Sequence, residues 1–342
     1  MGNQLPELFL SNKFCNMGTK VKINQIYNSE CLSGLRKLPD NLINCCVTSP
    51  PYYGLRDYGN KEQIGLECTP EEYIGKLVNI FHEVYRVLKP DGTLWINIGD
   101  SYAGSMKGAA QFPDNAMNYK QGTNRGTLGK ATLVKQCTGC KPKDLIGIPW
   151  MLAFALRADG WYLRQDIIWN KPNPMPESIT DRCTKSHEYI FLLSKSRKYY
   201  FDSESIQQEA SQSVKSRLGK VENVGHKAFA AANTLDESNP MFRKNTTREY
   251  QYADKANKRS VWSVPTAACK DAHFAVFPPA LIVDCIKAGC PQEGIVLDPF
   301  MGSGTTAVVA RKLNRNYIGF ELNSDYVHLA EKRIEEELGM FK

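Results

Sequence analysis

The chain has 342 residues, of which 42% are hydrophobic and 23% are charged, as expected for a globular protein with a large core. Its net charge of +7 at pH 7 permits an anionic partner without requiring one. No signal peptide and no apolar run long enough to span a bilayer are recognisable, and eleven cysteines then predict free thiols in a reducing cytoplasm. These features argue against a secreted disulfide-bonded protein and against an integral membrane protein.

The first hundred residues are expected to alternate between strands and helices. The clearest helix shows an apolar stripe at helical spacing, with Thr69-Pro70 as its start and Lys89-Pro-Asp-Gly92 as its stop. A helix that crosses between strands favours a parallel sheet. The predicted strands are 21–27, 42–47 and 93–98, and the predicted helices are 31–38 and 71–88.

Residues 101–144 differ in composition from the segments on either side. They are rich in Gly, Asn, Gln and Lys, and they contain seven Lys or Arg against two Asp. We expect a long, mobile, basic loop, because loops of this length are usually functional or disordered. Cys137 and Cys140 have the spacing of half a zinc site, and Cys183 and His187 are candidates to complete it. No second close pair follows, so plain thiols are favoured and no metal is predicted.

The second half returns to regular structure around one polar insert. Strands 162–170 and 188–194 have no long helix between them, which suggests a hairpin at one edge of the sheet. Residues 203–261 are polar, with ten Lys or Arg among scattered aromatic residues, and they show no periodicity. After them we expect helices at 277–289, 307–313 and 324–338 and strands at 294–297 and 316–320.

The turn Thr48-Ser-Pro-Pro-Tyr52 follows the buried strand 42–47. Two prolines cannot donate ladder hydrogen bonds, so the strand must end there, and open α/β sheets bind ligands at such strand ends. The Ser49 hydroxyl and the backbone carbonyls can accept hydrogens from an exocyclic amine, while Tyr52 can stack on a planar ring. The alternative is an ordinary proline-rich strand exit.

A glycine-rich turn, Gly302-Ser-Gly-Thr-Thr306, lies between a predicted strand and a predicted helix. Glu321 follows 19 residues after Gly302, at the end of the next strand. Glycines let the backbone approach a ligand and a carboxylate accepts from ribose hydroxyls, so we expect a nucleoside-containing ligand instead of a purely structural turn. A dinucleotide dehydrogenase would share this pattern, but Asp298-Pro-Phe300 before the glycines disfavours a diphosphate and suits a cation.

With both motifs in this order, the chain resembles the amino-group DNA methyltransferases of the permuted beta arrangement. Thr48-Ser-Pro-Pro-Tyr52 matches their (Ser/Asp)-Pro-Pro-Tyr motif, and Asp298-Pro-Phe-Met-Gly-Ser-Gly304 matches their Asp-Pro-Phe-x-Gly-x-Gly motif. The resemblance implies an α/β fold, a circularly permuted Rossmann-like sheet with helices on both faces and a target-recognition insert. It assigns the target amine to Ser49, Pro50, Pro51 and Tyr52. It assigns S-adenosylmethionine to Asp298, Phe300, Gly302, Ser303, Gly304, Thr305, Thr306, Glu321, Glu30, Phe277 and Pro278.

The same resemblance divides the chain by function. Residues 21–202 become the half that holds the target amine, 203–261 the target-recognition segment, and 270–342 the cofactor-binding half. The implied partner is double-stranded DNA. A cognate restriction endonuclease is possible, and the protein is expected to be a cytoplasmic monomer or homodimer of bacterial, archaeal or phage origin that does not associate with membranes.

The reaction implied is methylation of an exocyclic amine on a base that has been flipped out of the duplex. Adenine-specific relatives more often carry Asp where this chain has Ser49, so N4 of cytosine is the favoured target and N6 of adenine the alternative. Basic residues in 107–143 and 215–259, together with Arg56, are candidates for contacts to DNA. A non-catalytic DNA-binding protein on the same scaffold is the remaining alternative.

Overall fold

The computed structural model describes residues 21–55, 62–104, 139–210, 255–266 and 277–339. The chain forms two compact units, one made of residues 1–202 with 260–342 and the other of residues 203–259. In the second unit the described residues form a short helix, η4 (Glu204–Ile206), and an antiparallel pair, β6 (Gln208–Glu209) with β7 (Lys255–Ala256). Most of the two expected basic segments, and Arg56, lie outside the described residues.

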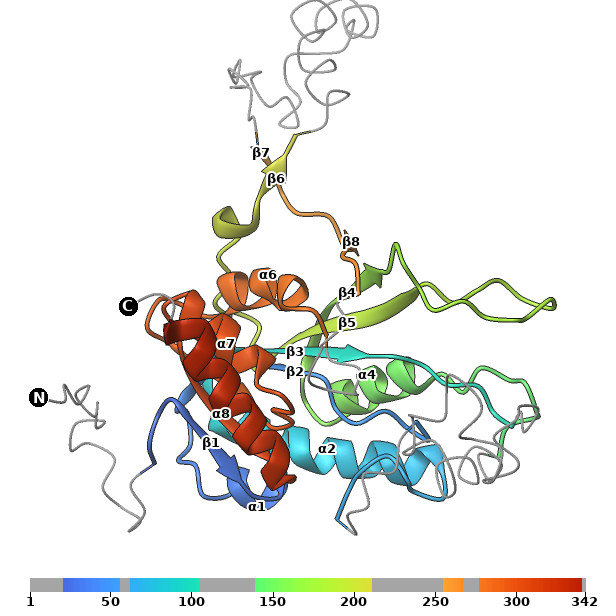
Figure 1. Cartoon of the computed structure of the whole chain (residues 1–342), viewed down its shortest axis with the longest axis horizontal. Helices are drawn as coiled ribbons and strands as arrows, with labels where there is room; N and C mark the ends of the chain where they lie inside the picture. Colours follow the sequence, from blue (N-terminus) through green and yellow to red (C-terminus); the bar gives the residue numbers. More distant parts are fainter. Residues whose placement is uncertain (1–20, 56–61, 105–138, 211–254, 267–276, 340–342) are drawn as a thin grey trace, which may run out of the picture. The chain divides into compact units, whose positions relative to one another are not determined.

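The first unit is built on a sheet that has eight strands in the described part of the chain (Figure 1). The strands lie in the order β1-β10-β9-β2-β3-β5-β4-β8. Neighbours from β1 to β3 are parallel, β5 is antiparallel to both β3 and β4, and β8 is parallel to β4. Their bounds are Gln25–Asn28 (β1), Ile43–Thr48 (β2), Leu88–Ile98 (β3), Tyr162–Asn170 (β4), His187–Ser194 (β5), Val261–Ser263 (β8), Ile295–Asp298 (β9) and Asn316–Glu321 (β10).

The strand order places the two sequence motifs side by side. β2 pairs with β9, with Cys46 opposite Leu297, although the two strands are about 250 residues apart in the chain. From β2 the chain continues through a helix to β3 on one side, and from β9 it continues through a helix to β10 on the other. This is a topological switch point, where a crevice opens outside the carboxyl ends of the strands.

Six helices of the described residues cover the sheet, three on each face (Figure 1). Side chains alternate along β9, so Ile295 and Leu297 join one core while Val296 is buried toward the other face. Burial on both faces explains why the central strands are continuously apolar. One layer holds α1 (Cys31–Leu35), α2 (Pro70–Val87) and α4 (Ile148–Ala158), and the other holds α6 (Pro279–Gly289), α7 (Thr305–Lys312) and α8 (Ser324–Gly339).

Local sequence explains where the best-predicted helix begins. The Thr69 hydroxyl accepts a hydrogen bond from the backbone N–H of Glu72 at 3.2 Å, and Pro70 occupies the first turn of α2. The predicted end of this helix is confirmed, because α2 ends at Val87, but the predicted strand start at Thr93 is wrong, because β3 already begins at Leu88. The pairing with β2 shifts register between Ile43 and Cys45, and this irregularity absorbs the proline and the glycine.

The prediction that the strand pair β4 and β5 forms the edge of the sheet is also wrong. The two strands do pair antiparallel, but β8 adds beyond β4, with Ile168 opposite Val261. A three-residue strand has no periodicity that a sequence could reveal, so only its tertiary partner identifies it. No helix among the described residues is both long and apolar enough to cross a membrane.

Candidate functional site

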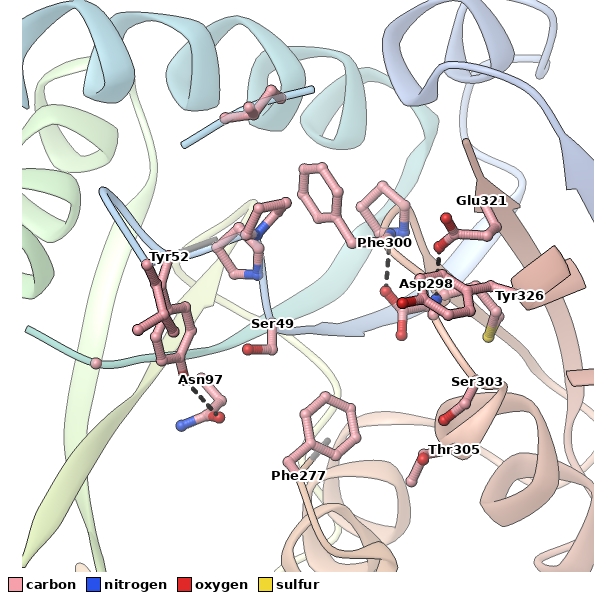
Figure 2. A pocket seen from close by; sticks show the side chains of 18 of the residues that line it. Ser49, Tyr52, Asn97, Phe277, Asp298, Phe300, Ser303, Thr305, Glu321 and Tyr326 are labelled. Carbon is pink, nitrogen blue, oxygen red and sulfur yellow. Dashed lines mark hydrogen bonds between the residues drawn. The ribbon is translucent and has the colours of Figure 1, made fainter. Parts of the chain in front are cut away.

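A pocket of about 950 Å³ opens at the carboxyl ends of β2, β9 and β10. Ser49 and Tyr52 lie at one end of it, and Asp298 and Glu321 lie at the other (Figure 2). Both sequence motifs therefore line a single pocket, as the switch point predicts.

Asp298 ends β9 and is buried, with 1% of its surface exposed. Its carboxylate accepts hydrogen bonds from the hydroxyls of Thr48 and Thr306, both at 2.6 Å, and from the backbone N–H of Phe300 at 3.0 Å. Burial raises the pKa of Asp298 to about 6, although the hydrogen bonds from Thr306 and Thr48 act in the opposite direction. The carboxylate thus links β2, β9 and α7 at the floor of the pocket.

The raised pKa of Asp298 predicts a pH-dependent stability. Between about pH 4 and pH 6 the folded protein holds a proton that the unfolded chain has released, so this group's contribution falls as pH rises through that window. At about 1.4 kcal/mol per pH unit the loss approaches about 3 kcal/mol. Urea unfolding at several pH values should show wild type losing stability relative to Asp298→Asn by that amount, since Asn does not titrate. A difference that stays constant with pH would contradict the assignment.

Glu321 ends β10 beside the glycine-rich turn. Its carboxylate accepts from the backbone N–H groups of Gly302, at 2.8 Å, and Asn323, at 2.9 Å, and burial raises its pKa. The Ser303 hydroxyl, which lines the pocket, is buried with no hydrogen-bond partner among the described residues. A buried polar atom without a partner is costly, so this hydroxyl is a candidate to bind a polar group of a ligand.

Some of the other residues predicted to bind a cofactor line the pocket, and others contact neighbouring elements of the fold. Phe277, Phe300, Gly302 and Thr305 line the pocket, and the Thr305 hydroxyl accepts from Arg333 at 2.9 Å. Thr306 donates to Asp298 instead, and Pro278 is the N-terminal cap of α6. Gly304 has φ +81°, and a Cβ there would lie 2.8 Å from the Ala330 Cβ, so the packing of α7 against α8 requires glycine at this position.

Glu30 lies on the pocket wall but already has a structural role. Its two carboxylate oxygens accept from the backbone N–H groups of Leu32 and Ser33, both at 2.7 Å, and so cap α1. These hydrogen bonds lower its pKa even though partial burial acts to raise it. The carboxylate is therefore fixed as an anion at the start of the helix.

At the opposite end of the pocket, Tyr52 is held by a network of polar side chains. Its hydroxyl donates to the Glu188 carboxylate at 2.6 Å and lies 3.3 Å from the Asn97 amide oxygen. Burial, together with the Glu188 charge, raises the Tyr52 pKa far above its usual value, so the hydroxyl stays protonated. A Cβ at Gly99 would lie 2.8 Å from the Tyr52 ring, so only glycine permits this ring position.

The other residues of the turn after β2 are Ser49, Pro50 and Pro51, and a hydrogen bond to its backbone holds the turn in place. Tyr73 of α2 donates to the Pro51 carbonyl at 2.7 Å, and Ser49 lines the pocket beside it. Among the described residues none donates to the Pro50 carbonyl. The prolines supply no N–H to the sheet, so this carbonyl remains available to a ligand.

Three residues of this site were not predicted from the sequence: Asn97, Lys171 and Glu188. Lys171 forms an ion pair with Glu188 and lies 4.4 Å from the centre of the Trp169 ring. Asn97 is the one polar residue in the apolar segment Leu94–Ile98 of β3. A polar residue in such a segment is the signal by which the sequence could have identified it. Lys171 and Glu188 are 17 residues apart and meet only because β4 and β5 pair.

The described residues include no group of three His, Cys, Asp or Glu side chains placed to hold a metal ion. Cys140 and Cys183 are exposed, while Cys137 lies outside the described residues. The suggested half of a zinc site therefore stays untested.

Comparison with known proteins agrees with this architecture. The model of the DNA methylase family for N6 and N4 amino groups matches residues 43–332. The chain is 44% identical over 314 residues to the type II methyltransferase M.Cfr9I of Citrobacter freundii, covering 91% of this chain and 88% of the relative. It is 43% identical over 332 residues to the type II methyltransferase M.SmaI of Serratia marcescens, covering 96% of each.

Two solved structures share the fold at low sequence identity. The PvuII DNA methyltransferase, described as cytosine-N4-specific, has a TM-score of 0.56 at 19% identity and covers 92% of this chain and 90% of its own. TTHA0409 from Thermus thermophilus, solved in complex with S-adenosyl-L-methionine, has a TM-score of 0.54 at 20% identity and covers 92% and 93%. With the family model matching most of its length, this chain belongs to the DNA methylase family of N6 and N4 amino-group methyltransferases.

Proposed function

We propose that this DNA methyltransferase uses S-adenosylmethionine to methylate the N4 amine of a cytosine flipped out of duplex DNA. The observation that carries the proposal is the single pocket that runs from Glu321 past Asp298 to Ser49 and Tyr52. One end offers carboxylates and a buried hydroxyl to a nucleoside-containing cofactor. The other offers acceptors and an aromatic ring to a planar base.

The residues at the cofactor end fit S-adenosylmethionine. Glu321 would accept from the ribose hydroxyls, and the Ser303 hydroxyl would gain the partner it otherwise lacks among the described residues. The anionic form of Asp298 would favour the positively charged end of the cofactor. When bound, S-adenosylmethionine supplies an electrophilic methyl group on a sulfonium centre.

At the base end, the chain's task is to make a poor nucleophile reactive. The lone pair of an aromatic amine is delocalised into the ring, so the amine attacks slowly until its nitrogen becomes tetrahedral. The Ser49 hydroxyl and the Pro50 carbonyl would accept its two hydrogens and favour that geometry. Tyr52 would stack on the ring and hold the nitrogen in line with the methyl group. No strong base is needed first, because the proton becomes acidic once the nitrogen is methylated.

The choice of cytosine rests on Ser49. A neutral hydroxyl is a weaker acceptor than the carboxylate more often found at this position in adenine-specific members of the family. Near Ser49 the Glu188 carboxylate also lines the pocket, but it is bonded to Tyr52 and Lys171. N6 of adenine on the same scaffold is the alternative target.

The remaining assignments concern DNA and partners. Lys171 and Lys185 line the pocket, and Arg182 lies shortly before Lys185 in the sequence. All three side chains are positively charged and therefore suit contacts to phosphate. Burial lowers the pKa of Lys185, whose ammonium donates to the Asp100 carbonyl at 3.3 Å.

We assign target recognition to residues 203–261, the amine site to 21–202 and the cofactor to 270–342. A cognate restriction endonuclease, a monomeric or homodimeric state and a cytoplasmic location complete the proposal.

The test is to identify the product. The protein is incubated with S-adenosylmethionine and unmethylated plasmid DNA, and the DNA is digested to nucleosides for mass spectrometry. N4-methylcytosine is the expected result. N6-methyladenine would overturn the inference from Ser49 but keep the pocket. No methylated base with the cofactor demonstrably bound would favour a DNA-binding protein that has lost catalysis, and Ser49→Ala serves as the low-activity control.

A further inference from the structure

Residues 171–186 connect β4 to β5 (Figure 1). Met175 is 82% exposed, the highest value for a large hydrophobic residue in the described part of the chain. Single exposed hydrophobic residues are ordinary. Of those in the described residues, however, only Met175 lines the pocket, so its position needs an explanation.

The backbone around Met175 is restrained on its N-terminal side. Pro174 and Pro176 flank it and fix φ on both sides. The Asn173 amide accepts from the backbone N–H of Thr266 at 2.9 Å and donates to the Thr266 carbonyl at 3.3 Å. A backbone held this way loses little conformational entropy when Met175 inserts into another surface.

The C-terminal side of the connection is also tied down. The Glu177 carboxylate accepts from Arg182 at 2.8 Å and from the backbone N–H of Lys185 at 3.2 Å. The Arg182 guanidinium lies 4.0 Å from the centre of the Tyr102 ring. Hydrogen bonds and a cation–π contact therefore hold the backbone on both sides of Met175, whose apolar side chain is exposed to solvent.

The chemistry around Met175 suits a stacked duplex. Lys171 and Lys185 line the same pocket and place positive charge near it, while the thioether is apolar and adaptable in shape. When a base leaves the stack it opens a gap between its neighbours. Other DNA-binding proteins insert apolar side chains, methionine among them, between base steps. An exposed apolar side chain that lines the pocket, on a restrained backbone, is in the position to do so.

We propose that Met175 is the wedge that enters the base stack of the DNA and occupies the space left by the flipped target base. The inference rests on the proposed function, because it requires a target base that enters the pocket. It makes Met175 a positioning residue, since its side chain contacts the neighbouring bases and not the reacting amine.

Two duplexes test the wedge, both built around the target sequence mapped from methylated plasmid DNA. In one the target base is paired, and in the other it faces an abasic site, so the pair is already lost. Single-turnover methylation by Met175→Ala should fall about 10-fold on the paired duplex and return to within about 2-fold of wild type on the abasic duplex. Met175→Leu should keep the wild-type rate on both because it restores an apolar side chain.

Leu145→Ala is the matched control. Leu145 is 52% exposed but does not line the pocket, so its variant should behave as wild type on both duplexes. Equal losses for Met175→Ala on the two duplexes, or no loss on either, would overturn the wedge while wild-type methylation upholds the proposed function. A wild-type protein that methylates neither plasmid nor duplex would overturn the proposed function itself, and the wedge with it.

Discussion

Replacing Tyr52 by alanine is expected to lower turnover about 100-fold while leaving the affinity for S-adenosylmethionine unchanged. The ring lies at the base end of the pocket, away from Asp298 and Glu321, so its loss removes the surface that would stack on the base (Figure 2). A target nitrogen that is poorly aligned with the methyl group costs about two orders of magnitude in rate. Single-turnover methylation and equilibrium cofactor titration measure the two effects separately.

Tyr52→Phe separates the ring from its hydroxyl. Phenylalanine keeps the stacking surface but cannot donate to Glu188, whose carboxylate still pairs with Lys171 and accepts from Asn97. A loss of about 10-fold is expected, since the ring is then less firmly oriented. If Tyr52→Ala kept wild-type turnover, the stacking role would be wrong, and if it lost cofactor binding as well, Tyr52 would be acting on the fold.

The second large effect is expected at Gly304, where alanine should destabilise the protein by about 3 kcal/mol or more. Gly304 caps α7 with φ +81°, a conformation that costs an L-residue about 1–2 kcal/mol. Its Cβ would also lie 2.8 Å from the Cβ and 3.2 Å from the Cα of Ala330, so α8 would have to move. Such overpacking adds about 1–3 kcal/mol.

Gly147 provides a matched control for that substitution. It caps α4 with φ +86°, nearly the same backbone conformation, but no described atom lies within 4 Å of a Cβ built there. Gly147→Ala should therefore cost only the backbone strain, about 1–2 kcal/mol. Urea unfolding of both variants isolates the contact with α8. Equal losses at the two glycines would show that this contact contributes nothing.

Cofactor affinity should separate the two glycine variants as well. Arg333 of α8 donates to the Thr305 hydroxyl, and Thr305 lines the pocket, so a displaced α8 disturbs the glycine-rich turn. Gly147 belongs to the layer of helices on the other face of the sheet. Gly304→Ala should therefore weaken S-adenosylmethionine binding, while Gly147→Ala should not.

Much of this protein was predictable because its signals are local. The apolar stripe of α2, the caps at Thr69 and Pro70, and the strand–turn–helix around Gly302 depend on residues close in sequence. The two motifs were also sufficient to indicate the family, since each is a short run with specific chemistry. The types of the predicted helices and strands were accordingly correct, and the errors fell at the start of β3 and at the edge of the sheet.

What the sequence could not supply depends on which strands become neighbours. Pairing of β4 with β5 brings Lys171 and Glu188 to Tyr52, and pairing of β2 with β9 lets Thr48 share the Asp298 carboxylate. The capping role of Glu30 and the packing role of Gly304 also depend on where their helices lie. The sequence by itself determined the elements and the two motifs, because these follow from local spacing and residue chemistry. Only the tertiary structure decided which side chains meet in the pocket, because those contacts join residues up to 250 positions apart.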